Sequence, residues 1–179
     1  MLTTKRLLLR QWTEDDFVPF ANMCADKDVM EFFPSLLTPH ESNAMATRIQ
    51  SLIAERGWGF WALEVIGGSK FIGFVGLHIP SDKMPFSPCV EIGWRIAKPY
   101  WDKGYATEAA HAALEYAFST LDLEEVVSFT TVNNKRSQAV MKKLGMLDTG
   151  NNFMHPDIQS SNPLCEHVLY KITRSQWSL

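Results

Sequence analysis

WRIAKPYWDKGYAT, residues 94–107, carries the strongest structural signal in this chain of 179 residues. A predicted strand over 89–96 ends in it, and a predicted helix over 104–120 begins at Gly104, because apolar residues then recur at spacings of three and four. The first N–H groups of a helix have no partner within it and carry the positive end of its dipole. The stretch therefore predicts a strand, loop and helix that can hold a phosphate. The alternative is that Gly104 serves only the turn.

Strands and helices alternate irregularly around this unit. Thr38, Pro39 and Glu41 form a capping box with proline at the first helical position, which predicts a helix to Arg56 that Gly57 ends. Further strands are predicted at 7–9, 58–66, 70–79, 126–132, 146–153 and 166–173, and further helices from residue 13 and over 134–144. The turn between 58–66 and 70–79 predicts a hairpin. This order predicts an α/β (α+β) fold, with a mixed antiparallel and parallel sheet flanked by helices.

The length and composition are those of one globular domain spanning residues 1–179. Hydrophobic residues make up 46% of the chain and charged residues 21%, a balance that argues against disorder. The formal charge of -3 leaves no global basic field to hold nucleic acid or an anionic membrane. The apolar stretches are shorter than the roughly 20 residues needed to cross a bilayer. We therefore expect neither a nucleic-acid partner nor a membrane partner.

Two further classes of protein are not expected, a secreted protein and a protein built around a metal centre or disulfides. Lys5, Arg6 and Arg10 interrupt the first segment, which therefore lacks the apolar core of a secretory signal peptide, and we expect a cytoplasmic protein. The three cysteines and five histidines are scattered. Cys165 and His167 form the one close pair, and two ligands do not make a site. We expect no metal centre and no disulfide framework.

Three separated segments resemble the GNAT N-acetyltransferases. They are the strand 90–96, the turn and helix start 101–109, and the helix 134–146 with its pattern NKRS followed by VMKKLGM. Within that superfamily the chain is most similar to the ribosomal-protein alanine N-acetyltransferase group (RimJ/RimL-like), whose opening resembles residues 4–10, TKRLLLR. The resemblance covers nearly the whole chain and implies a GNAT-like mixed sheet. A dinucleotide-type pattern at 57–62 is discarded, because it leads from a helix into a strand.

The resemblance also implies a co-substrate, acetyl-CoA, and the residues that bind it. Main-chain groups of Trp94, Arg95 and Ile96 would meet its pantetheine arm, and Asn134 would hydrogen-bond it. The loop that would wrap its pyrophosphate comprises Asp102, Lys103, Gly104, Tyr105, Ala106 and Thr107. Trp101 departs from the family pattern, which has glutamine or arginine at that position, so a side-chain contact from there is not expected.

Acetyl transfer to an amine needs a base that accepts the amine proton. A peptide α-amine, with a pKa near roughly 7.8, is neutral in about one molecule in seven at pH 7, whereas a lysine amine is neutral in about one in 2500. Glu91, an acid in an otherwise apolar strand, is the first candidate base, and a paired or edge-exposed carboxylate is the alternative. His78 is the second candidate, acting through water, and an ordinary surface or core-edge histidine is its alternative.

The departing thiolate needs a proton, which many GNAT enzymes supply from a tyrosine. The matching position here is Met141, which cannot donate. Ser137 lies on the same helical stripe and is the candidate acid by resemblance, unless its hydroxyl bonds back to a helix carbonyl. The acceptor would lie against aromatic side chains from the early helices and the second strand, which could equally be core: Phe32, Phe33, Trp58 and Trp61.

The sequence thus predicts an acetyl-CoA-dependent N-acetyltransferase. The acceptor is a primary amine, either a protein N-terminus or a small amine, which attacks directly in a ternary complex. The missing tyrosine keeps an alternative open, a catalytically weak or inactive acetyl-CoA-binding or sensor domain of the same fold. Whether the chain acts alone or as a homodimer is open.

Overall fold

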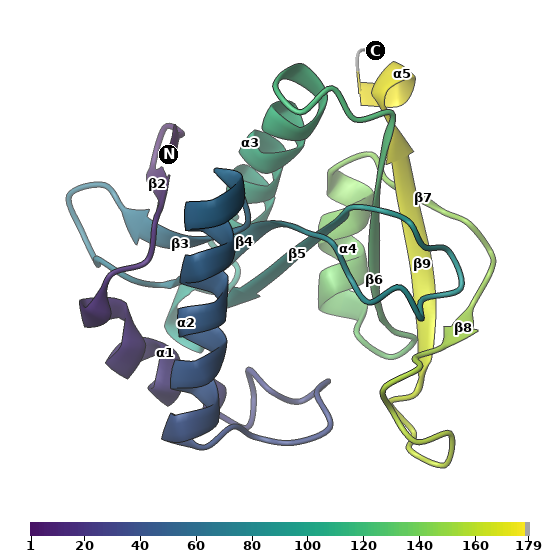
Figure 1. Cartoon of the computed structure of the whole chain (residues 1–179), viewed down its shortest axis with the longest axis horizontal. Helices are drawn as coiled ribbons and strands as arrows, with labels where there is room; N and C mark the ends of the chain where they lie inside the picture. Colours follow the sequence, from purple (N-terminus) through teal and green to yellow (C-terminus); the bar gives the residue numbers. More distant parts are fainter. Residues whose placement is uncertain (178–179) are drawn as a thin grey trace.

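The computed structural model describes residues 1–177, and its central feature is a nine-stranded mixed sheet with helices on both faces (Figure 1). The strands are β1 (Leu2–Thr3), β2 (Leu7–Arg10), β3 (Phe60–Val65), β4 (Gly73–His78), β5 (Glu91–Ile96), β6 (Glu125–Thr131), β7 (Leu147–Asp148), β8 (Phe153–Met154) and β9 (Glu166–Thr173). The helices are α1 (Phe17–Cys24), α2 (Pro39–Arg56), α3 (Tyr105–Ser119), α4 (Lys135–Lys143) and α5 (Arg174–Trp177), with short 3-10 turns η1 (Glu14–Asp16) and η2 (Lys98–Tyr100). The strand order is β1-β2-β3-β4-β5-β6-β9-β7, and β8 pairs with β9. The predicted fold class is confirmed.

Local chemistry places the helix ends where the sequence predicts them. The Thr38 side chain accepts a hydrogen bond from the Glu41 N–H, the Glu41 carboxylate accepts one from the Thr38 N–H at 2.8 Å, and α2 follows directly. Gly57 ends α2 in the left-handed region, with φ of 81°, which glycine adopts without a steric penalty. The predicted helix over 38–56 and the hairpin of β3 with β4 are therefore confirmed.

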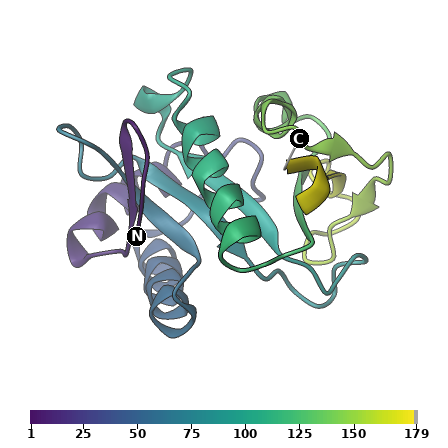
Figure 2. The ribbon, with the colours of Figure 1, turned by 90° about the horizontal axis from the view of Figure 1, so that it is seen from above.

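The two faces of the sheet are covered by different helices. Trp61 of β3 packs edge-on against Tyr116 of α3, with ring centroids 5.5 Å apart. Phe74 of β4 lies on the opposite face, 6.0 Å from Phe20 of α1. Figure 2 shows α3 crossing one face while α2 lies on the other. Fully buried alanines on α3, among them Ala109 and Ala113, let that helix approach the sheet closely.

The sheet opens between β5 and β6, which form its parallel pair. Their register in the described residues consists of one pair, Glu91 with Val127. Just beyond it the Ser128 hydroxyl donates to the Ile92 carbonyl at 2.9 Å. From Gly93 onward the edge of β5 has no ladder partner on β6, which creates room for a ligand inside the sheet.

Three segments differ from the sequence prediction. The expected strand over 146–153 is two short strands, because Gly150 adopts φ of 70° and its N–H donates to the Asp148 carboxylate, which turns the chain between them. The expected first helix begins as η1 before α1. Phe32 and Phe33 lie in turns and bends between α1 and α2 and not in a helix. None of the helices in residues 1–177 combines the length and apolar character that a membrane span requires.

Candidate active site

A cleft of about 630 Å³ occupies the opening between β5 and β6. It gathers most of the residues that the sequence singles out. Those that line it are Phe32, Phe33, Glu91, Trp94, Arg95, Ile96, Asp102, Gly104, Tyr105, Ala106, Thr107, Asn134 and Ser137. The four that the structure does not bring to this wall are Trp58, Trp61, His78 and Lys103.

The free edge of β5 presents main-chain hydrogen-bonding groups to the cleft. Along this edge the Val90 carbonyl accepts from the Val127 N–H, and the Ile96 carbonyl accepts from the Trp101 indole at 2.7 Å. Because alternate residues of a strand direct their N–H and C=O to the same side, those of Trp94 face the cleft between these two points. Trp101, the departure from the family pattern, thus has a structural role, since its indole closes the end of this edge.

The loop before α3 leaves several amides without partners. Asp102 and Gly104 adopt left-handed backbone with φ of 58° and 78°. The first helical hydrogen bond runs from the Glu108 N–H to the Gly104 carbonyl. The N–H groups of residues 105–107 therefore have no acceptor within the helix, at the positive end of its dipole. Because these residues line the cleft, this end of it can hold an anion.

The loop is held in place by the start of the chain. The Arg6 side chain donates to the Glu108 carboxylate at 2.6 Å and to the Lys103 carbonyl at 2.9 Å. Thr4 donates to the same carboxylate at 2.6 Å. The sequence pattern places Glu108 on the solvent face of its helix, whereas in the structure it joins Thr4 and Arg6 to the loop. The Lys103 ammonium lies 5.4 Å from the centre of the Tyr100 ring and not in the cleft.

Replacing Arg6 by methionine is expected to raise the KM for acetyl-CoA by about five- to tenfold, because the charge-assisted hydrogen bonds to the Lys103 carbonyl of the loop and to Glu108 of α3 are lost. The kcat should change by less than about twofold, since Arg6 is remote from the reacting groups. Steady-state kinetics with varied acetyl-CoA measures both constants. Lys5→Met, at the exposed neighbouring position, is the matched control. An unchanged KM in Arg6→Met would show that the loop holds its shape without this contact.

Glu91 stands in the cleft without a partner. It is half-buried at the start of β5, and no side-chain hydrogen bond or ion pair to it is present within residues 1–177. Burial raises the pKa of the Glu91 carboxyl from its ordinary value of 4.5 to about 8. Such a carboxyl can accept a proton from a neutral amine near pH 8.

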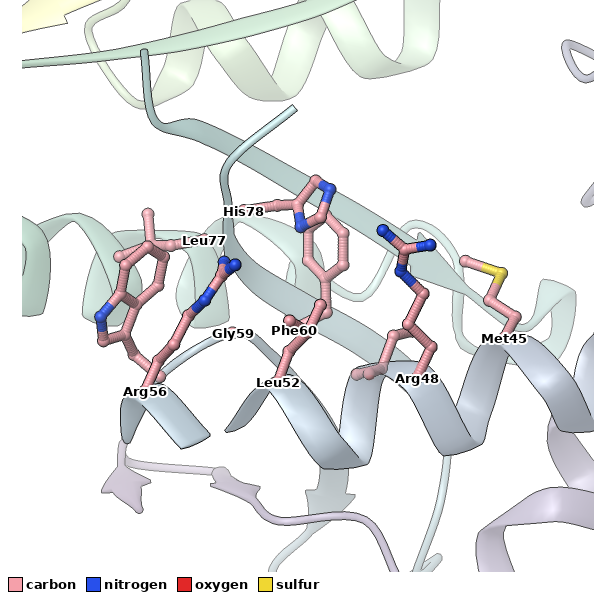
Figure 3. A pocket seen from close by; sticks show the side chains of 10 residues that line it. Met45, Arg48, Leu52, Arg56, Gly59, Phe60, Leu77 and His78 are labelled. Carbon is pink, nitrogen blue, oxygen red and sulfur yellow. The ribbon is translucent and has the colours of Figure 1, made fainter. Parts of the chain in front are cut away.

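His78 lies opposite Glu91 across β4 and β5, yet it lines a separate, smaller pocket of about 140 Å³. Figure 3 shows its ring beside Phe60, with Arg48 and Arg56 projecting from α2. The two rings are stacked with centroids 5.2 Å apart. Burial lowers the pKa of His78, and the two arginines lower it further.

Two aromatic candidates for acceptor binding lie elsewhere. Trp58 lines the same small pocket as His78. Trp61 is 1% exposed and packs on the α3 face of the sheet. The alternation of side chains along a strand sends Trp61 to the opposite face from Phe60. Of the four aromatic candidates, Phe32 and Phe33 are those that reach the cleft.

Asn134 and Ser137 form a hydrogen-bonded pair at the start of α4. The Asn134 side-chain oxygen Oδ1 accepts from the Ser137 N–H at 3.2 Å and caps the helix. The Asn134 amide donates to the hydroxyl oxygens of Ser137 at 3.1 Å and Thr130 at 2.9 Å. Because the Ser137 oxygen acts as an acceptor here, its own hydrogen is available to a group in the cleft. Both of these bonds use the amide nitrogen of Asn134 as donor.

The far wall of the cleft contains residues that the sequence reasoning missed. The rings of His155 and His167 lie 5.0 Å apart. Both residues line the cleft, and burial lowers the pKa of each. At the mouth, Arg136 stacks on Trp101 at 3.9 Å. In the sequence, the alternation of Cys165 and His167 on a predicted strand is the local signal for this wall. That alternation does not indicate which cavity the two side chains face.

Comparison with known proteins identifies relatives of the whole chain. The profile of the acetyltransferase (GNAT) domain family matches residues 6–147. The chain is 31% identical to the uncharacterized N-acetyltransferase YnaD of Bacillus subtilis over 99% of both chains. It superposes on a GNAT-family acetyltransferase from Bacillus anthracis with a TM-score of 0.80 and 24% identity, covering 97% of this chain and 98% of that one. It is also similar to spermidine N-acetyltransferase from Vibrio cholerae in complex with CoA and spermine, with a TM-score of 0.75 and 18% identity, covering 98% and 100%.

Proposed function

The chain belongs to the GNAT acetyltransferase family and is an acyltransferase enzyme, and we propose that it moves the acetyl group of acetyl-CoA to a primary amine by direct attack in a ternary complex. The observation that carries the proposal is the end of the β5–β6 ladder at Glu91 and Val127. The gap that follows leads from a partnerless carboxyl to the unpaired amides at the start of α3.

The cleft fits acetyl-CoA in three respects. The main-chain groups of Trp94 offer a donor and an acceptor to the pantetheine amides. The free amides of residues 105–107 offer a site for the pyrophosphate without a basic side chain. The volume of about 630 Å³ lies within the usual range of ligand pockets, about 300–1,000 Å³. When bound, acetyl-CoA supplies an activated acetyl thioester.

The side chains in the cleft are proposed to manage two protons. Glu91 accepts the proton that the amine loses as its bond to the acetyl carbon forms. Its pKa of about 8 is close to that of a peptide α-amine, roughly 7.8, so both are reactive in the same pH range. Ser137 donates a proton to the sulfur that leaves and regains one from water, and Asn134 positions the Ser137 hydroxyl. His78 stays the second candidate base, through water.

The acceptor is proposed to lie against Phe32 and Phe33, on the loop between α1 and α2. Two classes of acceptor are proposed. The RimJ/RimL-like resemblance supports a protein N-terminus, and the spermine bound to the Vibrio cholerae enzyme supports a small amine. The proposal treats residues 1–179 as one catalytic domain that acts in the cytoplasm. The continuous sheet from β1 to β9 supports the single domain.

Acetyl-CoA is expected to raise the melting temperature by several degrees, because ligand at 100 times its Kd adds about 2.7 kcal/mol to the free energy of unfolding. Release of the free thiol should then depend on an added amine. A panel of peptides and small amines, with a no-amine control for hydrolysis, measures that release. Intersecting initial-velocity lines are expected for a ternary complex, and parallel lines would contradict direct attack. Binding without thiol release from any amine would instead favour a non-catalytic acetyl-CoA-binding domain.

A further inference from the structure

The side chain of Arg95 is a buried cation on the wall of the cleft. Arg95 is 8% exposed and lines the cleft. It lies four residues beyond Glu91 on β5, so the two side chains leave the same face of the strand. Its guanidinium sits over the Phe33 ring at 4.2 Å and near the Phe74 ring at 5.5 Å. This positive charge is therefore held on the acceptor side of the cleft.

No anion within residues 1–177 neutralises this charge. The Arg95 Nη1 donates to the Cys24 sulfur at 3.3 Å, and the buried Nε has no hydrogen-bond partner. Burial raises the pKa of the Cys24 thiol, so at neutral pH that partner is uncharged. Of the carboxylates that line the cleft, Asp28 pairs with Lys98 at 2.5 Å and Asp157 with Lys83 at 3.8 Å. Glu31, outside that lining, pairs with Arg136 at 3.1 Å.

An unpaired buried guanidinium is energetically unfavourable, because desolvation is not offset by a counter-charge. The two phenylalanine rings recover part of that cost through cation–π contact. The rings do not, however, provide a conventional hydrogen-bond acceptor for the Nε of Arg95. A carboxylate would take the donors of the planar guanidinium in a bidentate pair, the geometry for which arginine is suited.

The phosphates of the co-substrate are not placed to serve as this anion. Their proposed site is the start of α3, which covers the face of the sheet that carries Trp61. Trp94 pairs with Val75, which pairs with Trp61, so Trp94 shares that face. Arg95, the next residue, leaves the opposite face. The anion at Arg95 is then a part of the acceptor.

We propose that Arg95 binds a carboxylate group of the acceptor, so that the preferred substrate is an amine that also carries an acid. This inference rests on the proposed function, which places the reacting amine at Glu91. The Cα atoms of Glu91 and Arg95 are about 13 Å apart along an extended strand, and both side chains shorten that gap. An amine and a carboxylate separated by several bonds, as in an ω-amino acid or a short peptide, fit this distance better than an α-amino acid.

A matched pair of ligands tests this inference, 5-aminopentanoate and its neutral analogue 5-aminopentanamide. Calorimetry with the CoA-saturated protein measures binding without requiring turnover, and kcat/KM for the same pair measures use as substrates. The acid is expected to bind and react at least about tenfold better than the amide in the unmodified protein, and about equally in Arg95→Met. The KM for acetyl-CoA should change by less than twofold. Arg48→Met, an exposed arginine outside the cleft, should retain the preference.

The outcomes separate this inference from the proposed function. Binding of the acid without acetylation of any amine would overturn the proposed function and leave Arg95 as a carboxylate site. Equal use of acid and amide by the unmodified protein, also with 4-aminobutanoate and 6-aminohexanoate against their amides, would overturn the role of Arg95. If Arg95→Met raised the KM for acetyl-CoA tenfold and left the preference for the acid over the amide unchanged, Arg95 would bind the co-substrate and not the acceptor.

The melting temperature distinguishes an Arg95 that binds a ligand from one that only supports the fold. Arg95→Met removes an unpaired buried charge and should keep or raise the melting temperature, whereas a structural arginine would lower it. If Arg95→Met does not fold, the stability expectation is wrong and Arg95 has a structural role as well. Arg95→Lys, which keeps the charge but not the fork, then decides the ligand preference and should retain part of it.

Discussion

Replacing Glu91 by glutamine is expected to lower kcat/KM for the acceptor amine by about 10²- to 10³-fold at pH 8, the range of a lost general base. In the unmodified enzyme the rate should rise with pH and level off above about 8, because the carboxylate that accepts the proton forms as Glu91 titrates. Glutamine does not titrate, so the acid limb should become shallower and retain only the titration of the amine itself. An unaltered profile in Glu91→Gln would leave His78 or solvent as the base.

The same substitution has a stability signature that serves as a control. The pKa of Glu91 in the folded protein, about 8, is above its ordinary value of 4.5, so between these pH values the native state binds the proton more tightly than the unfolded state. Its contribution to stability is fully present below pH 4.5 and is lost as the pH rises through 8. Glu91→Gln should therefore match the unmodified protein at pH 4 and exceed it at pH 9, by up to a few kcal/mol. Urea unfolding at the two pH values measures the difference, and equal stability at both would mean that the carboxyl is well solvated.

Replacing Ser137 by alanine is expected to lower kcat by about 10²-fold, because the leaving sulfur loses its proton donor. The affinity for acetyl-CoA should change by less than about twofold, since the proposed binding contacts come from main-chain groups elsewhere. Stopped-flow thiol release and calorimetry with acetyl-CoA measure the two quantities separately.

Two matched variants make the Ser137 result specific. Ser137→Thr keeps a hydroxyl at the same position and should recover most of the turnover. Ser119→Ala removes a hydroxyl that donates to the Glu115 carbonyl at the far end of α3, and it should leave turnover unchanged. If Ser137→Ala turned over normally, Ser137 would be reduced to a partner of Asn134 at the helix start.

Much of the fold could be predicted because its signals are local. The capping box at Thr38, the glycine that ends α2 and the period of the α3 alanines each involve residues within one or two turns of the chain. Side-chain alternation likewise separates the faces of β3, with Trp61 on one side and Phe60 on the other. The GNAT resemblance added the proposed acetyl-CoA contacts along β5 and before α3, whose backbone geometry follows from the strand–loop–helix sequence itself.

The contacts that distinguish this cleft join segments far apart in the chain. Arg6 reaches Glu108 over 102 residues, and Arg95 reaches Cys24 over 71. A hydrophobic period predicts that a residue faces inward or outward, but it does not specify which distant side chain it will meet, so it does not reveal that Glu108 joins Thr4 and Arg6. The positions of His78 and Trp61 could not be predicted for the same reason. Whether an inward-facing residue borders the cleft, a second pocket or the core depends on how the sheet opens between β5 and β6. The chain sequence therefore predicted the helices and strands and the loop that precedes α3. Long-range packing decided which charged groups are buried in the cleft, how burial raises the pKa of Glu91, and which residues form the cleft walls.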